Sequence, residues 1–409
     1  MERWKINLYT VWFSQIISIM SFSFGFPFLP FYVQELGVVD PDKLKLYTGL
    51  LNTSAAITMA VMAPVWGLIA DRWGKKLMLL RATFFASFII AGMGLAMNVH
   101  QLIIMRLIQG IFTGTVTASA ALVASGTPSN RLSYAMGFMS SSTFIGASIG
   151  PVIGGFVAEA AGYRTSFFIG GLLMMIDFFI VLFLVKEKKI EEQPGNAIED
   201  REKSKQASLA SIFTSLIIIM LFVLVILRMT RTVFAPYLPL FVQELLSGGG
   251  GAVKYTGIIN GVTGLTTALS GLTISRLGDR CSKMTLILLL FIAGVVCSIP
   301  LAFSRNLWVF IVVYGLFFFI MGGIEPVVVS MTTEITPPER RGVLFGIQGL
   351  VGNIGWAISP MLGSLVSMRY SIQAILLVLP IIMLPGIGAV FLLRMKENKP
   401  SAANTDIQV

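Results

Sequence analysis

The stretch GASIGPVIGG, from Gly146 to Gly155, lies inside an apolar run that extends from about Tyr134 to Val157. Five of its ten residues are glycine or proline. In water these residues interrupt helices, because glycine carries an entropic cost and proline lacks a backbone donor. Inside a bilayer both are tolerated, and small residues one turn apart let two helices approach closely. The stretch therefore predicts a membrane helix that can bend and pack closely, through Gly146, Gly150, Pro151, Gly154 and Gly155.

The composition of the whole chain also indicates a membrane protein. Its 409 residues are 55% hydrophobic and only 12% charged, with a mean hydropathy of +0.83, too apolar for one water-soluble core. The net charge of +10 is scattered between apolar runs, which indicates topology signals rather than a nucleic-acid partner. Two cysteines and one histidine, His100, give no spacing for a metal site, so no metal, cofactor or enzymatic activity is expected.

Apolar segments long enough to cross a bilayer occur twelve times, at about 20 residues each. They predict an all-α membrane protein with two six-helix halves, residues 1–186 and 209–396, a polar linker at 187–208 and a tail at 397–409. The spans are placed at about 6–34, 47–70, 77–97, 100–123, 133–158, 165–186, 210–243, 255–275, 284–303, 306–332, 342–367 and 371–394.

The distribution of lysine and arginine predicts the orientation. The loops on the side of both termini carry 21 of these residues, the opposite loops carry 6, and 3 lie inside spans. Because positive charge is retained on the cytoplasmic side, both termini are expected in the cytoplasm and the chain in the plasma (inner) membrane. A monomer in the lipid bilayer is expected.

The two halves repeat. PFLPFYVQEL at residues 27–36 recurs as PYLPLFVQEL at 236–245, a shift of 209, and YTGLLN at 47–52 recurs as YTGIIN at 255–260, a shift of 208. The opening stretch has its own copy in Gly355, Ser359, Pro360 and Gly363. Parallel repeats of six spans are one of the known transporter architectures, with the substrate site between the halves near the midplane.

The loop after the second span has the spacing G-x3-D-R-x-G-x-K, and a degraded copy follows span eight. This loop resembles the most diagnostic motif of the major facilitator superfamily. The resemblance implies a cytoplasmic gating loop in which an acid pairs with neighbouring spans and latches the halves together; the alternative is that its basic residues only follow the positive-inside rule. The residues concerned are Gly67, Asp71, Arg72, Gly74, Lys75 and Lys76, with Asp279 and Arg280 in the copy.

Span four contains Arg106 and Gln109 in the pattern R-x2-Q-G-x3-G, and Gln109 is also expected to line the cavity. A charge at a helix centre in the membrane costs roughly 3 kcal/mol, so such an arginine indicates a functional group. The pattern resembles the fourth-span motif of the family, whose arginine is implicated in proton coupling. The alternative is an arginine that reaches a nearby membrane surface.

The opening stretch has the form G-x3-G-P-x2-G-G and resembles the fifth-span signature of the drug/proton antiporter branches of the superfamily. From Trp4 to Lys396 the chain is similar to the twelve-span bacterial drug-efflux branch. The resemblance implies a proton-coupled transporter that exports amphipathic drugs, with span five meeting span eight. One departure is that no carboxylate lies between Ile6 and Gln34, where some multidrug members have one.

Proton coupling requires a titratable group inside the membrane, and a desolvated carboxylate is the usual choice. Two acids lie well inside spans, Asp177 in span six and Glu325 in span ten. Glu325 is preferred because the first helix of each three-helix unit lines the central cavity in this fold. Asp177 is a second proton-site candidate, with a helix-packing hydrogen bond as the equal alternative.

Arg228 and Arg231 are spaced i, i+3 and therefore share one face of span seven. We expect one or both to face the cavity and approach Glu325. The alternatives are recognition of an anionic substrate and pairing with helix-end carbonyls.

Aromatic and amide residues on cavity-lining spans complete the expected pocket, since drug sites combine apolar walls with few polar groups. Ordinary helix packing remains the alternative for each. They are Phe24, Phe28, Asn52, Tyr237, Asn260, Tyr314, Asn353 and Trp356.

Three functions remain open at this point. The preferred one is proton-driven export of small amphipathic molecules, with substrate and protons as the partners. The same fold could instead carry an endogenous sugar, amino acid, lipid or anionic metabolite. A membrane receptor or scaffold is the third.

Overall fold

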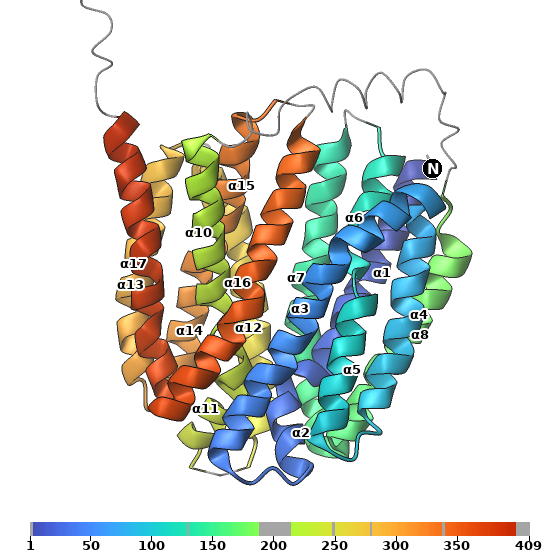
Figure 1. Cartoon of the computed structure of the whole chain (residues 1–409), viewed down its shortest axis with the longest axis vertical. Coiled ribbons are helices and arrows are strands. Elements are labelled where there is room, and N and C mark those ends of the chain that lie inside the picture. Colours follow the sequence, from blue (N-terminus) through green and yellow to red (C-terminus); the bar gives the residue numbers. More distant parts are fainter. Residues whose placement is uncertain are drawn as a thin grey trace, which may run out of the picture.

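The computed structural model describes residues 3–128, 131–187, 214–247, 250–278, 280–337 and 340–397. Every regular element in these ranges is a helix, and the helices form twelve membrane spans, so the all-α fold with twelve spans is confirmed (Figure 1). The predicted linker and tail lie outside the described residues except for Glu187 and Glu397.

The spans of the first half are α1 Arg3–Gly25 with η1 Phe26–Phe28 and α2 Leu29–Glu35, α3 Pro41–Trp73, α4 Lys75–Met93, α5 Val99–Phe112 with α6 Thr115–Gly126, α7 Leu132–Ala161 and α8 Tyr163–Leu184. Those of the second half are α10 Ser215–Thr232 with η4 Ala235–Tyr237 and α11 Leu238–Leu245, α12 Ala252–Gly278, α13 Lys283–Phe303, α14 Leu307–Gly322 with α15 Ile324–Glu334, α16 Arg341–Arg369 and α17 Ile372–Glu397.

Helices α1 and α17 respectively begin and end at the same end of the bundle, which we call the terminal face (Figure 1). The opposite end, which contains the connection from α2 to α3, is called the far face. Matched asparagines begin the fourth and tenth spans at the far face. The side chain of Asn98 accepts the backbone N–H of Gln101 at 3.0 Å, and Asn306, 208 residues later, accepts the N–H of Trp308 at 2.9 Å. These N-caps satisfy donors that the first helical turn leaves free.

Four spans are interrupted inside the membrane, in repeat-related pairs. Spans one and seven change from α-helix to a 3₁₀ turn at the sequences FPF and APY, because the proline ring cannot continue the helical hydrogen bonds. Spans four and ten break at Gly114 and Gly323, a shift of 209. Gly114 has φ +134°, a conformation that favours glycine. Such breaks leave backbone groups free near the midplane, as in transporter binding sites.

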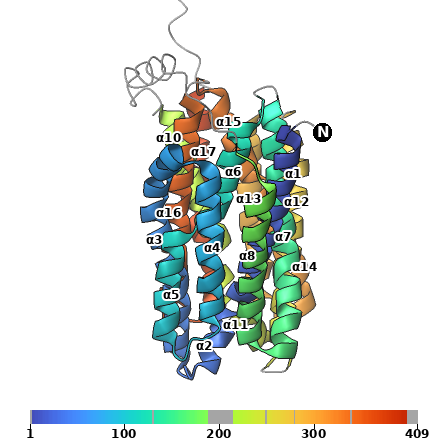
Figure 2. The ribbon, with the colours of Figure 1, turned by 90° about the vertical axis from the view of Figure 1, so that its right-hand side faces the viewer.

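The halves meet through two symmetric helix pairs, α7 with α12 and α3 with α16, as the two views of Figures 1 and 2 show. A Cβ added at Gly257 would lie 2.4 Å from the carbonyl oxygen of Pro151, and one added at Gly49 would lie 3.2 Å from that of Pro360. These two contacts correspond to each other through the repeat. The predicted meeting of span five with span eight is therefore confirmed.

The glycine face of α7 needs a correction, because its residues point at two different neighbours. A Cβ at Gly150 would lie 2.6 Å from Ser23 Cβ, and one at Gly154 would lie 2.6 Å from the carbonyl oxygen of Phe24, both within the same half. Gly146 likewise faces α1. Of the four glycines in the stretch, Gly155 alone approaches α12, since a Cβ added there would lie 3.2 Å from the carbonyl oxygen of Val253. Residues four apart in a helix share one face. The G-x3-G-x3-G series of α7 therefore packs against α1 of the same half, and the neighbouring residues of α7 make the contact with the other half.

The described contacts between the halves concentrate towards the far face. Gln34 donates to Gln243 at 3.1 Å and Thr53 to the carbonyl oxygen of Ala357 at 3.1 Å. Towards the terminal face, a Cβ added at Gly67 of α3 or Gly346 of α16 would meet no atom within 4 Å, and the two helices diverge there in Figure 1. The bundle is therefore closed at the far face and more open at the terminal face.

Candidate functional site

Arg228, Arg231 and Glu325 form a compact charged cluster inside the second half, which we call the Arg–Glu cluster. Arg228 Nη2 pairs with Glu325 Oε1, and Arg231 Nη1 lies 3.2 Å from Glu325 Oε2. The side chains of Arg228, Arg231 and Glu325 are 44%, 21% and 25% exposed, respectively. The expected approach of the arginines to Glu325 is present, and the carboxylate remains partly accessible.

The helix breaks of spans seven and ten place these charges. Arg231 lies in the last turn of α10 and Glu325 in the first turn of α15. Cations are favoured at helix C-termini and anions at N-termini, because the unpaired backbone carbonyls and N–H groups carry partial charges. The cluster therefore joins two helix ends whose own dipoles favour the charges that they carry.

Neighbouring side chains surround the Arg–Glu cluster on two sides. The guanidinium carbon of Arg231 lies 5.9 Å from the ring centroid of Phe318. Across from Arg228, Gly352 and Gly355 of α16 come within 3.7 and 3.2 Å of its side chain, measured from an added Cβ. Asn353 and Trp356 lie on the same helix beside these glycines and are half-buried. An aromatic ring and the small residues of α16 therefore flank the two cations of the cluster.

Arg106 is buried in the first half at 4% exposure. Its Nε donates to the carbonyl oxygen of Leu51 at 2.9 Å, its Nη1 donates to Gln109 Oε1 at 2.7 Å, and its guanidinium lies 4.6 Å from the ring centroid of Phe26. Within the described ranges no acidic side chain pairs with it. The side chain therefore stays inside the membrane and ties α5 to α3, instead of reaching a surface.

Asp177 lies in a different interface, between α8 and α1, with no exposed surface. Its Oδ2 accepts a hydrogen bond from Ser18 Oγ at 2.5 Å. Its Oδ1 and the hydroxyl of Ser14, one turn before Ser18, have no hydrogen-bond partner in the described part of the chain. Asp177 is thus placed where helices pack within one half, apart from the inter-half helix pairs.

Several residues expected to line a cavity are packed instead. Tyr314 is 3% exposed and stacks on Phe310 with ring centroids 5.1 Å apart. Tyr237 is fully buried and donates to the carbonyl oxygen of Pro360 at 2.7 Å, while Phe24 and Phe28 are also buried. The amides turn back onto their own helices: Asn52 and Asn260 donate to the carbonyl oxygens four residues earlier, Thr48 and Thr256, each at 2.9 Å.

The gating loop is held by an acid that the sequence patterns did not single out. Glu187 accepts the backbone N–H groups of Lys75 at 2.8 Å and Lys76 at 3.0 Å, and therefore caps α4, which follows Gly74. Gly74 has φ +102°, which places these N–H groups at the start of the helix. The side chain of Asp71 and all of Asp279 lie outside the described residues, so the proposed latch stays a prediction. Arg280 lies in the turn after α12, where its backbone N–H donates to Leu277.

Twelve spans in two repeated halves, interrupted near the midplane beside a charged cluster, define a secondary transporter rather than an enzyme. The model of the Major Facilitator Superfamily matches residues 11–257 and 220–408. The chain therefore belongs to this superfamily, and it is a multi-pass transporter with multidrug-efflux relatives.

Two curated relatives are similar over nearly the whole chain. The Multidrug resistance protein MdtG of Proteus mirabilis (strain HI4320) is 30% identical over 383 residues, covering 91% of this chain and 92% of the relative. The Multi-drug resistance efflux pump PmrA homolog of Lactococcus lactis subsp. lactis (strain IL1403) is 30% identical over 372 residues, covering 91% of each.

Solved structures support the fold. A bacterial homologue of the human lysosomal transporter Spinster, in an inward-facing and occupied conformation, has a TM-score of 0.76 at 12% identity and covers 97% of both chains. The nucleoside transporter NupG has a TM-score of 0.75 at 13% identity, covering 94% of this chain and 99% of that one. At these identities the likeness concerns the architecture alone.

Proposed function

We propose that this chain is a proton-coupled antiporter that exports amphipathic compounds such as drugs. The names of both relatives, a multidrug resistance protein and a multidrug efflux pump, support the cargo class. The half-buried aromatic and amide residues near the Arg–Glu cluster, Trp356 and Asn353, suit a site with apolar walls and few polar groups.

The observation that carries the proposal is the Arg–Glu cluster itself. With Glu325 ionised, its two arginines leave the cluster with a net charge of +1; with Glu325 protonated, the net charge is +2. Charges separated by about 4 Å at an effective dielectric constant of 20 interact by about 4 kcal/mol. A proton on Glu325 therefore disfavours a cationic substrate nearby, and by linkage the substrate disfavours the proton. Such mutual exclusion is what an antiporter needs.

The halves would rock about the two symmetric contacts of Gly257 with Pro151 and Gly49 with Pro360. In the described state the far face is closed. The excess of basic residues in the loops of the terminal face supports a cytoplasmic position of that face. Substrate would then enter from the cytoplasm or the membrane and leave at the far face, while protons return.

In this proposal Arg106 holds α5 against α3 through two neutral acceptors, the carbonyl oxygen of Leu51 and the side-chain oxygen of Gln109. Asp177, which accepts a hydrogen bond from Ser18 of α1, is the second candidate for the titratable group, with helix packing as the alternative. Neither touches the Arg–Glu cluster in the contacts described above.

Substrate-driven proton movement in proteoliposomes tests the proposal. Glu325→Gln should abolish substrate-driven proton movement. Glu334→Gln is the matched control, because it removes a carboxylate of the same helix, α15, that pairs with Lys283 at the terminal face. It should retain the proton movement. Undiminished proton movement in Glu325→Gln would contradict the assignment.

For the cargo, drug sensitivity of an efflux-deficient host with and without the protein is decisive. No change for any cationic or neutral compound would favour an anionic metabolite as the substrate.

A further inference from the structure

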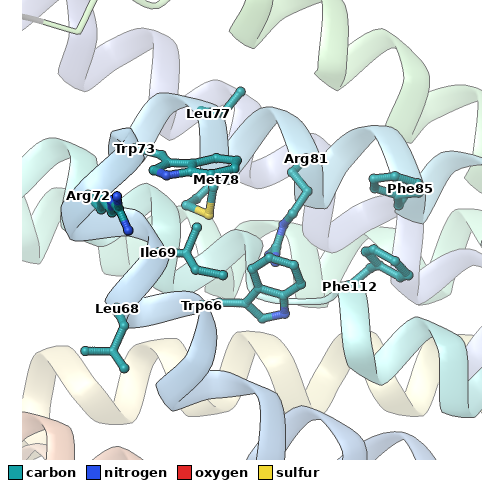
Figure 3. Close-up of a pocket in the computed structure, with 10 residues that line it drawn as sticks. All are labelled: Trp66, Leu68, Ile69, Arg72, Trp73, Leu77, Met78, Arg81, Phe85 and Phe112. Atoms are coloured by element: carbon teal, nitrogen blue, oxygen red, sulfur yellow. The ribbon is translucent and has the colours of Figure 1, made fainter.

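A cavity of about 650 Å³ opens at the side of the first half, separate from the Arg–Glu cluster. It lies between the end of α3, the start of α4 and the end of α5 (Figure 3). Eight of its ten lining residues are apolar or aromatic, and the other two are arginines. The lining residues are Trp66, Leu68, Ile69, Arg72, Trp73, Leu77, Met78, Arg81, Phe85 and Phe112.

Arg81 has hydrogen-bond donors without an acceptor among the described residues. Its guanidinium carbon lies 3.4 Å from the ring centroid of Trp66, and the Trp66 ring is fixed by a hydrogen bond from its Nε1 to the carbonyl oxygen of Ile111 at 2.6 Å. The Nε and Nη1 atoms of Arg81 are buried and have no hydrogen-bond partner among the described residues. Unpaired buried donors on a cation are costly, so this arginine can serve an acceptor other than the described residues.

Exposed apolar side chains line the mouth of the cavity. Leu68, Trp73 and Leu77 are 75%, 66% and 44% exposed, and they lie at the terminal-face ends of the second and third spans, which end at Ala70 and begin at Lys75. Exposed apolar side chains at this level contact acyl chains, and tryptophan is typical of the membrane boundary. Arg72, also exposed, stands at the rim (Figure 3). An occupant that reaches this cavity therefore comes from the lipid leaflet.

We propose that the cavity binds an anionic phospholipid of the leaflet at the terminal face. Its phosphate would accept hydrogen bonds from Arg81 and Arg72, since guanidinium groups bind phosphate through parallel N–H donors. Its acyl chains would lie along Leu68, Leu77 and Phe85. The site is specific to the first half: at the repeat shift of 208, Arg81 corresponds to Leu289.

Native mass spectrometry of the purified full chain tests this site, with phosphatidylglycerol and phosphatidylcholine of the same chain length as probes. The wild-type chain should bind one phosphatidylglycerol about tenfold more tightly than phosphatidylcholine, and Arg81→Gln should remove that preference. Arg276→Gln is the matched control, because it removes an exposed arginine from the last turn of α12 in the other half. It should leave the preference unchanged.

A second variant keeps both arginines and tests the cavity itself. Ile69→Trp fills the space and should weaken the binding of both lipids, which keeps the site testable if Arg81→Gln does not fold. The proposal is overturned if Arg81→Gln retains the preference for phosphatidylglycerol, or if the wild-type chain binds the two lipids equally. Displacement of phosphatidylglycerol by an equal concentration of inorganic phosphate would also overturn it, because the occupant would then be a free anion.

Discussion

The two halves repeat in backbone but hold their membrane-embedded charges differently. In the first half, Arg106 is bound by neutral groups, and Asp177 lies in another interface with a serine partner. In the second half, two cations and Glu325 share one partly exposed cluster. The first arrangement fixes helices against each other, whereas the second leaves a carboxylate whose partners can change.

Within the membrane, the repeat preserves the helix breaks and not the charges beside them. The glycine breaks of spans four and ten, Gly114 and Gly323, coincide at the shift of 209, but the same shift places Val116 opposite Glu325 and Gly315 opposite Arg106. The helix breaks are therefore common to both halves, whereas the charged side chains beside each break differ between the halves.

Removal of both arginines should have the largest effect. Arg228→Gln with Arg231→Gln leaves Glu325 without its ion partners. Loss of the partners of a fully buried charge costs about 3 kcal/mol, and we expect a smaller cost here because the Glu325 side chain is 25% exposed. Addition of Glu325→Gln should restore most of that stability, since no unpaired charge remains. Thermal unfolding in detergent of wild type, the double variant and the triple variant measures both changes.

The matched change in the first half is Arg106→Gln. It loses the hydrogen bond to Leu51, and we expect a cost of about 2 kcal/mol, because the lost bonds involve a charged donor. Neutralisation of Asp177 should not restore this stability. If Asp177→Asn does restore it, the two first-half groups are coupled and the contrast between the halves is wrong.

Glycine substitutions should have the next largest effect and separate packing within a half from packing between halves. Gly150→Val collides with α1 at Ser23 Cβ and the backbone of Met20; overpacking of this kind costs about 1–3 kcal/mol, so folded yield should fall. Gly257→Val collides with the Pro151 carbonyl in the other half, so the halves should fold but close poorly at the far face. Folded yield from size-exclusion chromatography and exchange rates in proteoliposomes distinguish the two outcomes.

The control for the inter-half change is alanine at each of the two symmetric contacts. Gly49→Ala meets mostly side-chain atoms, Ser364 Cβ and Tyr237 Oη at 2.9 Å, whereas Gly257→Ala meets a backbone oxygen at 2.4 Å. Side chains shift more readily than helix backbone. Gly257→Ala should therefore slow exchange more than Gly49→Ala, and equal slowing would show that the contacts are equivalent despite these distances.

Asp177→Asn should have a smaller effect than Glu325→Gln on exchange. The asparagine carbonyl can still accept from Ser18, so we expect a stability change of about 1 kcal/mol and transport rates within about twofold of wild type if the role is packing. Ser18→Ala is the matched control on the other side of the bond. Loss of proton movement in Asp177→Asn as complete as in Glu325→Gln would move the coupling site to the first half.

Much of this contrast could be predicted from the sequence, because it depends on local patterns. The i, i+3 spacing of Arg228 and Arg231, the membrane depth of Glu325 and the resemblance to the family fold favoured their approach, with an anionic substrate and helix-end carbonyls as the alternatives. The rotation of each helix was not predictable, and it directs Gly150 to α1 rather than to α12. The cap of α4 by Glu187 was not predictable either, since it joins residues more than 100 positions apart through the turn at Gly74. Patterns within one helix show which face is small or charged, whereas the neighbour of that face is decided by tertiary packing.

The smallest expected effect concerns how each half begins its second span. Asp40 caps α3 by accepting the backbone N–H groups of Asp42 at 2.8 Å and Lys43 at 3.1 Å, whereas Gly250 and Gly251, which precede α12, have no side chain that could accept. The N–H of Lys43 and then that of Asp42 hold the pKa of the exposed Asp40 carboxyl below its usual value. A group with a lowered folded pKa stabilises the protein above its unfolded pKa, about 3.9, and loses this effect as the pH falls through the folded value. The unfolding temperature of wild type should therefore exceed that of Asp40→Ala near pH 7, and the difference should shrink below about pH 4. A difference that stays constant down to pH 3 would show that the aspartate acts through its shape and not through its charge, and the two halves would then differ at this helix start only in backbone flexibility.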